Sequence, residues 1–112
     1  MPNPTPKRGD IWWAALDPTL GSEIKKTRPC LILSTNLIND NRRTIMAVPL
    51  STSTRAHPPI TVKVHCQGKS VVAVVDQLRA ITKERLKGFI EKAQTEEVDD
   101  IVTALATLLE AQ

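Results

Sequence analysis

The chain has 112 residues, of which 41% are hydrophobic and 24% charged, and this composition excludes a wholly disordered polypeptide and fits one globular domain. Its formal net charge of +3 permits a polyanionic partner without requiring one. No apolar run approaches the length of a membrane span and no signal peptide is recognisable, so we expect a soluble, cytoplasmic protein that does not associate with a membrane.

The N-terminal part of the chain changes character at residue 8. Residues 1–7 contain three prolines and few apolar side chains, which predicts a flexible arm ahead of a single domain spanning residues 8–112. Asp10 to Leu16 is apolar and predicts the first strand, in which alternation directs at least one of two adjacent tryptophans toward the core. A polar, basic loop follows to Thr27. Pro29 lacks an N–H and suits the first position of a second strand.

The middle of the chain predicts loops and short strands in alternation. Residues 37–43 are polar and rich in Asn, which indicates a turn or a long loop, and Thr44 to Leu50 is the next strand. Residues 60–65 alternate strictly, which directs Ile60, Val62 and Val64 to the core and Thr61, Lys63 and His65 outward. A turn at residues 67–69 leads to the continuously apolar segment 71–75, a strand covered on both faces or by a partner subunit.

The C-terminal third predicts two further short strands and the clearest helix of the chain. Residues 78–81 continue the preceding strand region, residues 82–86 form one helical turn with Thr82 as its N-cap, and residues 87–93 form a strand. The final helix has Thr95 as its N-cap. It carries a continuous apolar stripe at helical spacing, made of Val98, Ile101, Val102, Leu105, Leu108 and Leu109.

These elements describe a mainly β protein: a small barrel-like antiparallel sheet with short helices and a C-terminal helix packed on it. Its two cysteines, Cys30 and Cys66, fall in or beside predicted strands without the spacing of a redox or metal motif, so we expect buried, reduced thiols. His57 and His65 are far apart in sequence and have no acidic pairing in the pattern, which argues against a histidine-pair ribonuclease mechanism. No cluster has metal-ligand spacing, and we expect neither metal nor cofactor.

Several short motifs occur in a fixed order along the chain. They are Arg8-Gly9-Asp10-Ile11-Trp12, Asp17-Pro18, Gly21-Ser22-Glu23, Thr27-Arg28-Pro29, Val48-Pro49-Leu50-Ser51, Asp76-Gln77-Leu78-Arg79-Ala80-Ile81 and Lys83-Glu84-Arg85-Leu86. In this order and spacing the chain resembles the MazF/PemK toxin endoribonucleases of type II toxin–antitoxin systems, from Lys7 to about Leu109. None of these motifs is specific alone.

The resemblance implies an SH3-like antiparallel β-barrel with a C-terminal helix, assembled as a homodimer. It implies sequence-specific, ribosome-independent and metal-independent cleavage of single-stranded mRNA that leaves 2′,3′-cyclic phosphate and 5′-hydroxyl ends. It also implies a cognate antitoxin whose acidic, flexible C-terminal segment occupies the RNA groove.

Two residues are candidates for catalysis. Arg28 suits charge stabilisation of a pentacoordinate phosphorane, because its planar guanidinium can donate two parallel hydrogen bonds to phosphate oxygens. The competing interpretation is a surface arginine paired with Glu23 or Asp76. Ser51 stands where the family places a second catalytic hydroxyl, although a strand-end serine also commonly caps a turn. Thr52 takes that place if the register shifts by one residue.

The remaining candidates are substrate-binding residues. Ser22 and Glu23 resemble substrate-contacting positions of the family, and Asp76 and Gln77 resemble residues that line the same groove. Glu23 and Asp76 are both candidates for the base that activates the 2′-hydroxyl. Lys25 and Lys26 would attract the flanking phosphates, with solvated loop charges as an equal alternative.

One departure from the family limits the proton-transfer scheme. The PemK-like branch has a histidine before the loop glutamate and an arginine two residues before the aspartate, where this chain has Ser22 and Val74. Two other functions remain open. The first is a gyrase poison of the same fold, which the absence of an aromatic residue near the C-terminus disfavours. The second is a plain RNA-binding barrel, which the shortage of aromatic stacking residues disfavours.

Overall fold

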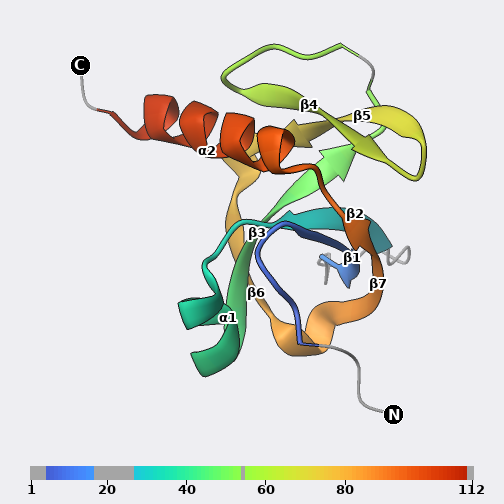
Figure 1. The fold of residues 1–112 in the computed structure, drawn as a ribbon, viewed down its shortest axis with the longest axis vertical. Helices are drawn as coiled ribbons and strands as arrows, with labels where there is room; N and C mark the ends of the chain where they lie inside the picture. The colour runs from blue at the N-terminus through green and yellow to red at the C-terminus, as the bar shows by residue number, and fades with distance from the viewer. Residues whose placement is uncertain (1–4, 17–26, 54, 111–112) are drawn as a thin grey trace, which may run out of the picture.

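The structure, a computed structural model, describes residues 5–16, 27–53 and 55–110. In chain order the elements are β1 (Asp10–Ala15), β2 (Thr27–Ile32), α1 (Asn36–Asn41), β3 (Thr44–Ser51), β4 (Thr61–Cys66), β5 (Lys69–Val74), the 3₁₀ turn η1 (Val75–Gln77), β6 (Arg79–Thr82), the 3₁₀ turn η2 (Lys83–Arg85), β7 (Leu86–Lys92) and α2 (Thr95–Leu109). The strands pair antiparallel in the order β4-β5-β3-β2-β1-β7, with β6 also paired to β3. Figure 1 shows this sheet as a curled half-barrel with α2 across one side, which confirms the expected fold class.

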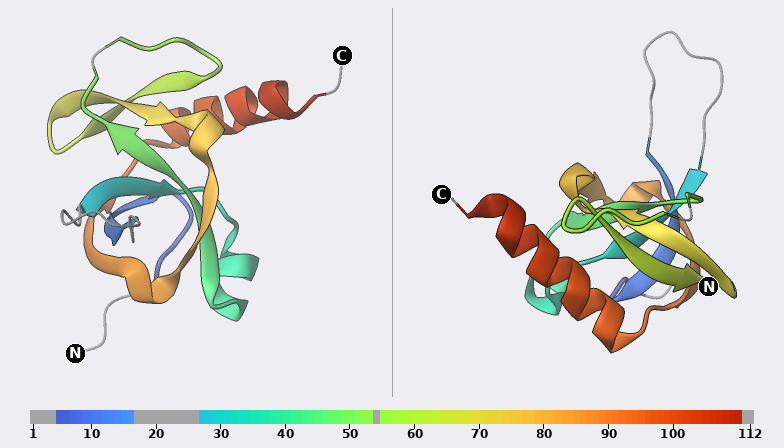
Figure 2. Two further views of the ribbon diagram at one scale, coloured as in Figure 1. Left: turned by 180° about the vertical axis from the view of Figure 1, so that it is seen from behind. Right: turned by 90° about the horizontal axis from the view of Figure 1, so that it is seen from above.

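The curled sheet has a hydrophobic cluster on each face, because neighbouring residues of a strand point to opposite sides. On β1, Ile11 joins the cluster beneath α2, whereas Trp12 and Ala14 join the cluster inside the curl. Both views in Figure 2 place α2 outside the curl, along the sheet. Trp13 points away from Trp12 and is 36% exposed, so the expectation that at least one tryptophan faces the core is confirmed.

Helix α2 closes the outer cluster with the predicted stripe. Val98 and Ile101 are buried, and Val102, Leu105 and Leu108 pack against the same cluster, whereas Leu109 is exposed and was wrongly included. The N-cap prediction was also wrong. Gln94 is the N-cap, Thr95 is the first helical residue, and no side chain caps this helix end. The end is held instead by Glu97, which is buried against β4.

Glu97 and His65 form a contact that the sequence pattern did not indicate. The Glu97 carboxylate lies 2.7 Å from His65 Nδ1 and accepts a hydrogen bond of 3.0 Å from the His65 backbone N–H. The expectation that His65 has no acidic partner is therefore wrong, since the packing of α2 on β4 brings together residues 32 positions apart. His65 itself lies on the exposed face of β4, as predicted.

The β4–β5 hairpin has the predicted turn. Cys66 pairs with Lys69 across a two-residue loop, and both loop residues, Gln67 and Gly68, have positive φ angles (54° and 76°) as a type I′ turn requires. Val62 and Val64 are buried as expected, but Ile60 is 49% exposed. Ile60 precedes the strand, in a turn where its N–H bonds to the carbonyl of His57, so the strand alternation does not extend to it.

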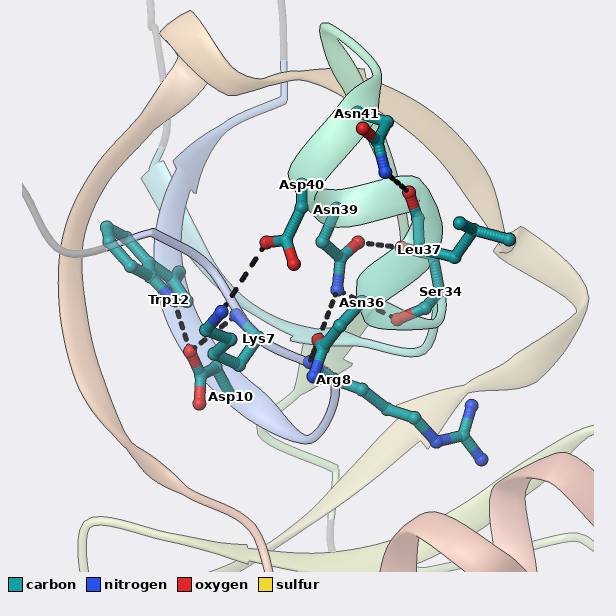
Figure 3. A network of polar contacts seen from close by, with 10 residues as sticks. All are labelled: Lys7, Arg8, Asp10, Trp12, Ser34, Asn36, Leu37, Asn39, Asp40 and Asn41. Carbon is teal, nitrogen blue, oxygen red and sulfur yellow. Dashed lines mark hydrogen bonds and ion pairs between the residues drawn. The ribbon is translucent and has the colours of Figure 1, made fainter.

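Residues 36–41 form a short helix, α1, in place of the predicted turn or loop. The prediction failed because polar contacts rather than an apolar stripe hold this segment. Asn39 is fully buried, its amide donating to the carbonyl of Ser34 (2.9 Å) and to Asn36 Oδ1 (3.2 Å), while its own side-chain oxygen accepts from the Ser34 hydroxyl (2.5 Å). Figure 3 shows these contacts beneath the helix.

The start of β2 differs from the prediction, whereas the helical turn after Thr82 begins where it was predicted. Strand β2 begins at Thr27, two residues before Pro29. Pro29 is tolerated inside the strand because at that position β2 is paired only with β1, and pairing with β3 begins at Cys30. The single helical turn after Thr82 is present as η2, but the Thr82 side chain makes no capping hydrogen bond.

The N-terminal arm and the domain boundary at residue 8 stay predictions. Within the described part, the Lys7 N–H donates to Asp10 Oδ2 (2.8 Å) and the Lys7 ammonium lies 3.4 Å from Asp40. Both cysteines are buried and free, as expected. Among the residues that the structure describes, no helix is long and apolar enough to cross a membrane.

Candidate active site

Arg28 and Ser51 lie at the same end of the sheet, where β2 begins and β3 ends. The β2–β3 register pairs Cys30 with Pro49 and Leu31 with Val48. Arg28 precedes Cys30 by two residues and Ser51 follows Pro49 by two residues, so each lies on the same strand face as that paired residue. The β2–β3 pairing itself does not extend to Arg28 and Ser51, but both residues line the same two cavities. In Figure 1 the start of β2 and the arrowhead of β3 lie on the same side of the molecule. Strand pairing thus joins two candidates that are 23 positions apart in sequence.

Two cavities adjoin at this strand end, and they share Arg28, Leu50 and Ser51. The first cavity, of about 390 Å³, is further lined by Trp13, Thr27, Pro29, Thr52, Cys66, Gln67, Lys69 and Val71. The second cavity, of about 380 Å³, is further lined by Leu16, Pro49, Val74, Gln77 and Arg79. Arg28 and Ser51 therefore lie between the two cavities. This is the position expected of two residues that act on the middle of an extended ligand, with its ends in the two cavities.

The charge of these cavities is one-sided. Arg28, Lys69 and Arg79 line them, and within residues 5–16, 27–53 and 55–110 no carboxylate does. Over the same residues, the Arg28 guanidinium has neither a hydrogen bond nor a salt bridge, so a pairing with Asp76 is not present. An exposed guanidinium without an internal partner is available to an anionic ligand.

The pKa of the Cys30 thiol indicates that the guanidinium groups of Arg28 and Arg79 both lie near it. Burial raises the pKa of Cys30 to about 12, and the nearby cations of Arg79 and Arg28 oppose that rise. Burial also raises the pKa of Cys66, with a further contribution from the Glu91 carboxylate. Because a thiolate rather than a thiol is the nucleophile, neither cysteine is suited to covalent catalysis at neutral pH.

Ser51 ends β3 with a half-exposed side chain. Among the described residues, its hydroxyl accepts only a long contact of 3.4 Å from the Ser53 backbone N–H, at the outer limit of hydrogen-bond geometry. The turn-capping role considered for this serine is therefore weak, and no other described residue occupies the hydroxyl, which faces both cavities.

The structure brings together only some of the residues predicted from sequence. Thr52 lines the first cavity and Gln77 the second, on either side of Arg28 and Ser51. Asp76 is exposed in η1 and lines neither cavity. Four candidates of the β1–β2 loop, Ser22, Glu23, Lys25 and Lys26, lie outside the described residues.

Among the cavity residues that were not predicted are one aromatic and two cationic side chains, those of Trp13, Lys69 and Arg79. The outward position of Trp13 was readable from strand alternation, because its neighbour Trp12 fills the core. Arg79 lies in the motif Asp76-Gln77-Leu78-Arg79-Ala80-Ile81, which could have identified it. Lys69 had no comparable signal, since an isolated basic residue beside a turn is usually a solvated charge. In the described ranges no three His, Cys, Asp or Glu residues gather as a metal site, and the expectation that the protein uses no metal or cofactor stays a prediction.

Known proteins share both the sequence pattern and the fold. The family model described as PemK-like, MazF-like toxin of type II toxin-antitoxin system matches residues 7–109. The endoribonuclease toxin MazF of Escherichia coli K12 is 34% identical over 76 residues, which cover 68% of each chain. A mycobacterial endoribonuclease solved in complex with its cognate antitoxin has a TM-score of 0.73 at 25% identity, covering 94% of this chain and 93% of its own. MazF of Deinococcus radiodurans, at 24% identity, shares the fold with a TM-score of 0.80 over 96% of this chain and 98% of its own.

These matches carry more weight than the individual motifs, because the family model spans nearly the whole described domain. The expected enzyme class, endoribonuclease, is confirmed at the level of the family, since the curated relatives bear that name. The chain belongs to the PemK-like, MazF-like toxins of type II toxin–antitoxin systems.

Proposed function

We propose that this protein is a sequence-specific, ribosome-independent endoribonuclease toxin that cuts single-stranded mRNA at the strand end occupied by Arg28 and Ser51. One observation carries the proposal: these two residues are shared by two adjoining cavities whose described charges are all cationic. A single-stranded RNA carries one phosphate per nucleotide. Its backbone can therefore lie across Arg28 while neighbouring nucleotides enter the cavities on either side.

The proposed reaction uses the RNA's own 2′-hydroxyl as the nucleophile. The 2′-oxygen forms a bond to the adjacent phosphorus, the bond from phosphorus to the 5′-oxygen breaks, and the leaving oxygen takes a proton. The products are a 2′,3′-cyclic phosphate and a 5′-hydroxyl. In this scheme the charge of the phosphorane is stabilised by Arg28, whose guanidinium donates two hydrogen bonds to the non-bridging oxygens, so no metal ion is needed.

The other polar residues of the strand end have supporting roles in this proposal. The Ser51 hydroxyl donates a hydrogen bond to the scissile phosphate. Thr52 and Gln77 contact nucleotides on opposite sides of the cut, in line with their places in the first and second cavities. Ser22, Lys25 and Lys26, which precede β2 in the sequence, are also proposed to bind the RNA.

The base that accepts the 2′-hydroxyl proton is Glu23 or Asp76. Asp76 is an exposed residue outside the described cavity walls, so it would need to approach the substrate from the rim. A direct comparison of Glu23→Gln with Asp76→Asn in single-turnover cleavage distinguishes them. The residue that acts as the base is the one whose variant no longer shows a cleavage rate that rises with pH.

The proposed partners are a cognate antitoxin and a second copy of the chain, in the cytoplasm. The mycobacterial relative solved with its cognate antitoxin supports the first. The cations of the groove, which have no acidic partner among the residues that the structure describes, support binding of an acidic, flexible segment there. Sedimentation at micromolar concentration tests the homodimer, and a monomer would contradict it.

The experiment that tests the function is a digest of a long single-stranded RNA by the purified protein in EDTA, followed by mapping of the new 5′ ends. We expect cuts at one short recurring sequence, 5′-hydroxyl termini and cyclic-phosphate partners. Intact RNA over a long incubation would contradict the proposal. Salt-sensitive binding without cuts would then indicate an RNA-binding barrel, and stabilised gyrase–DNA cleavage complexes a gyrase poison.

A further inference from the structure

Trp13 is the one large aromatic side chain that the fold leaves open at the proposed groove. The chain has only three such residues. Trp12 is buried, and Phe89 packs edge-on against it with ring centroids 5.9 Å apart and an interplanar angle of 74°. Trp13 lies on the opposite face of β1, is 36% exposed and lines the first cavity together with Arg28. Large apolar side chains are usually buried, and this protein has few aromatic residues to build its core. A tryptophan left half-exposed in a cationic cavity is therefore unusual.

The walls around Trp13 suit a flat, largely apolar ligand group. Pro29, Leu50 and Val71 line the same cavity, and its volume of about 390 Å³ lies within the range of small-molecule sites. Trp13 pairs with Gly88 of β7, and a Cβ added at Gly88 would lie 4.0 Å from Trp13 Cδ1, so the indole lies over the part of β7 where the side chain is absent. The ring therefore lies beside β7 and is exposed on its cavity side.

Polar groups occur at the rim, where the edge of a base would need partners. Gln67, Thr52 and Lys69 line the cavity beside the β4–β5 turn. Gln67 has a left-handed backbone (φ 54°), and its N–H donates to the carboxylate of Glu91 on β7. This contact links the tip of the β4–β5 hairpin to β7, at the other end of the strand order. One wall of the cavity is thereby held in position before a ligand binds, which lowers the entropic cost of binding.

We infer that the first cavity is a nucleobase subsite, in which the base of a nucleotide next to the scissile phosphate stacks on Trp13 while Gln67 and Thr52 contact its polar edge. The inference rests on the proposed RNA cleavage. In the β1–β2 register Trp13 pairs with Pro29 and Ala14 pairs with Arg28, so Trp13 and Arg28 point to opposite faces of the sheet end. A nucleotide bound there has its phosphate at Arg28 on one face of the sheet, while its base reaches past the end of the strands to Trp13 on the other face. Single-stranded RNA is commonly recognised with its bases unstacked and splayed out in this way.

A binding experiment tests the subsite without requiring cleavage. The probes are a short fluorescent oligodeoxynucleotide, which lacks the attacking hydroxyl, and a backbone-matched oligomer of abasic residues. The full-length protein should bind the base-containing probe about 5- to 150-fold more tightly, the range expected for one stacked base. Trp13→Ala should lose most of that preference, and Trp13→Phe should retain most of it.

Phe89→Ala is the matched control, because Phe89 is also an exposed aromatic (48%) but lines neither cavity. It should keep the wild-type preference, and circular dichroism should show that every variant is folded. An unchanged preference for bases in folded Trp13→Ala overturns the inference.

A cleavage experiment locates the subsite along the RNA. Once the cut sequence is known, substrates with a single abasic position on either side of the cut are compared. One position should slow wild-type cleavage by about 5- to 150-fold and leave Trp13→Ala unaffected, because the interaction that it removes is already absent. A penalty of equal size in both proteins at every position overturns the inference. Failure of the wild-type protein to cut any RNA contradicts the proposed function instead, and the binding experiment remains decisive for the subsite.

Discussion

Polar side chains near the N-terminus and polar side chains at the end of the sheet have different roles in this molecule. The N-terminal network, shown in Figure 3, joins Lys7, Arg8, Asp10, Ser34, Asn36, Asn39 and Asp40. There the Asp10 carboxylate accepts from the Lys7 N–H, from Trp12 Nε1 (3.2 Å) and from the Lys92 ammonium (3.1 Å). At the strand end, in contrast, Arg28 has no such partner among the described residues, and Lys69 and Arg79 also face the cavities.

The difference separates polar groups that maintain the fold from polar groups that await a ligand. A buried carboxylate is stable only when its charge is compensated from within, so the partners of Asp10 are part of the folded structure. Like charges gathered around an open cavity oppose one another and contribute no stability. Their arrangement is therefore better explained by a polyanionic ligand than by folding.

The largest effect should come from Arg28→Ala. We expect RNA cleavage to fall by at least about 100- to 1,000-fold, because a hydrogen-bond donor to the transition-state charge is lost. The melting temperature should hardly change, since exposed side chains without partners contribute little stability. Single-turnover cleavage and thermal unfolding measure the two effects. Arg42→Ala, which removes an exposed arginine outside both cavities, is the control and should cleave normally.

Asp10→Ala should show the reverse pattern. It leaves the indole N–H of Trp12 and the N–H of Lys7 without their acceptor, and we expect a loss of about 3 kcal/mol in the free energy of unfolding. Well below its melting temperature the variant should still cleave RNA. Asp40→Ala removes only an exposed salt bridge to Lys7 and should cost less than about 1 kcal/mol by urea unfolding. Equal losses in the two variants would remove the distinction between buried and exposed acids in this network.

Lys69→Ala should have a smaller effect, confined to substrate affinity. Loss of one phosphate-binding cation should lower the slope of log affinity against log salt by about 0.7, the value for single-stranded nucleic acid. Titration of a non-cleavable oligonucleotide at several salt concentrations measures that slope. Lys63→Ala is the control, since Lys63 is an exposed cation of β4 that lines neither cavity, and its slope should equal that of the wild type.

The smallest effect near neutral pH concerns Cys30, whose thiol reports on both arginines. In the unfolded chain a thiol ionises near pH 9, but in the folded protein the pKa of Cys30 is about 12. The folded state therefore holds the proton more tightly. The resulting stability is complete below about pH 9 and is lost as the pH rises toward 12. Urea unfolding across that range should show a steep decline in the wild type and a shallower one in Cys30→Ala.

Removal of Arg79 tests whether its guanidinium lies near the Cys30 thiol. Arg79 opposes the rise in the pKa of Cys30 more strongly than Arg28 does. Arg79→Ala should therefore raise the pKa of the thiol further and slow its alkaline labelling by a thiol reagent. Labelling at the wild-type rate would show that Arg79 does not approach Cys30.

Elements with a strong local pattern were predictable from sequence. The C-terminal helix follows from a stripe of apolar residues at helical spacing, and β4 follows from strict alternation at Val62 and Val64. Helix α1 was not predictable in this way. It has almost no apolar periodicity, and it is held by the hydrogen bonds of buried Asn39 to Ser34 and Asn36. Ser34 is held in turn by β3, because its hydroxyl accepts a hydrogen bond from the Met46 N–H, and that tertiary contact leaves no signal in the local sequence.

The candidate site was predictable where a residue's chemistry stood beside a recognisable motif. Arg28 is the clearest example, because the guanidinium suits phosphate and Thr27-Arg28-Pro29 belongs to a family pattern. The His65–Glu97 contact was missed for the opposite reason. Neither residue lies in a motif, and only the docking of α2 on β4 brings the carboxylate to the imidazole.

By itself, then, the sequence determined most of the strands and the C-terminal helix, the apolar face of β4 and of α2 apart from Ile60 and Leu109, and that Arg28 is the residue best suited to hold a phosphate. Only the tertiary structure decided what surrounds Arg28. Antiparallel pairing of β2 with β3 brought Ser51 to the same end of the sheet as Arg28, and the curl of the sheet brought Trp13, Lys69 and Arg79 to that end as well. The physical reason is that hydrophobic periodicity acts over a few residues, whereas strand register and sheet curvature depend on pairing between distant segments.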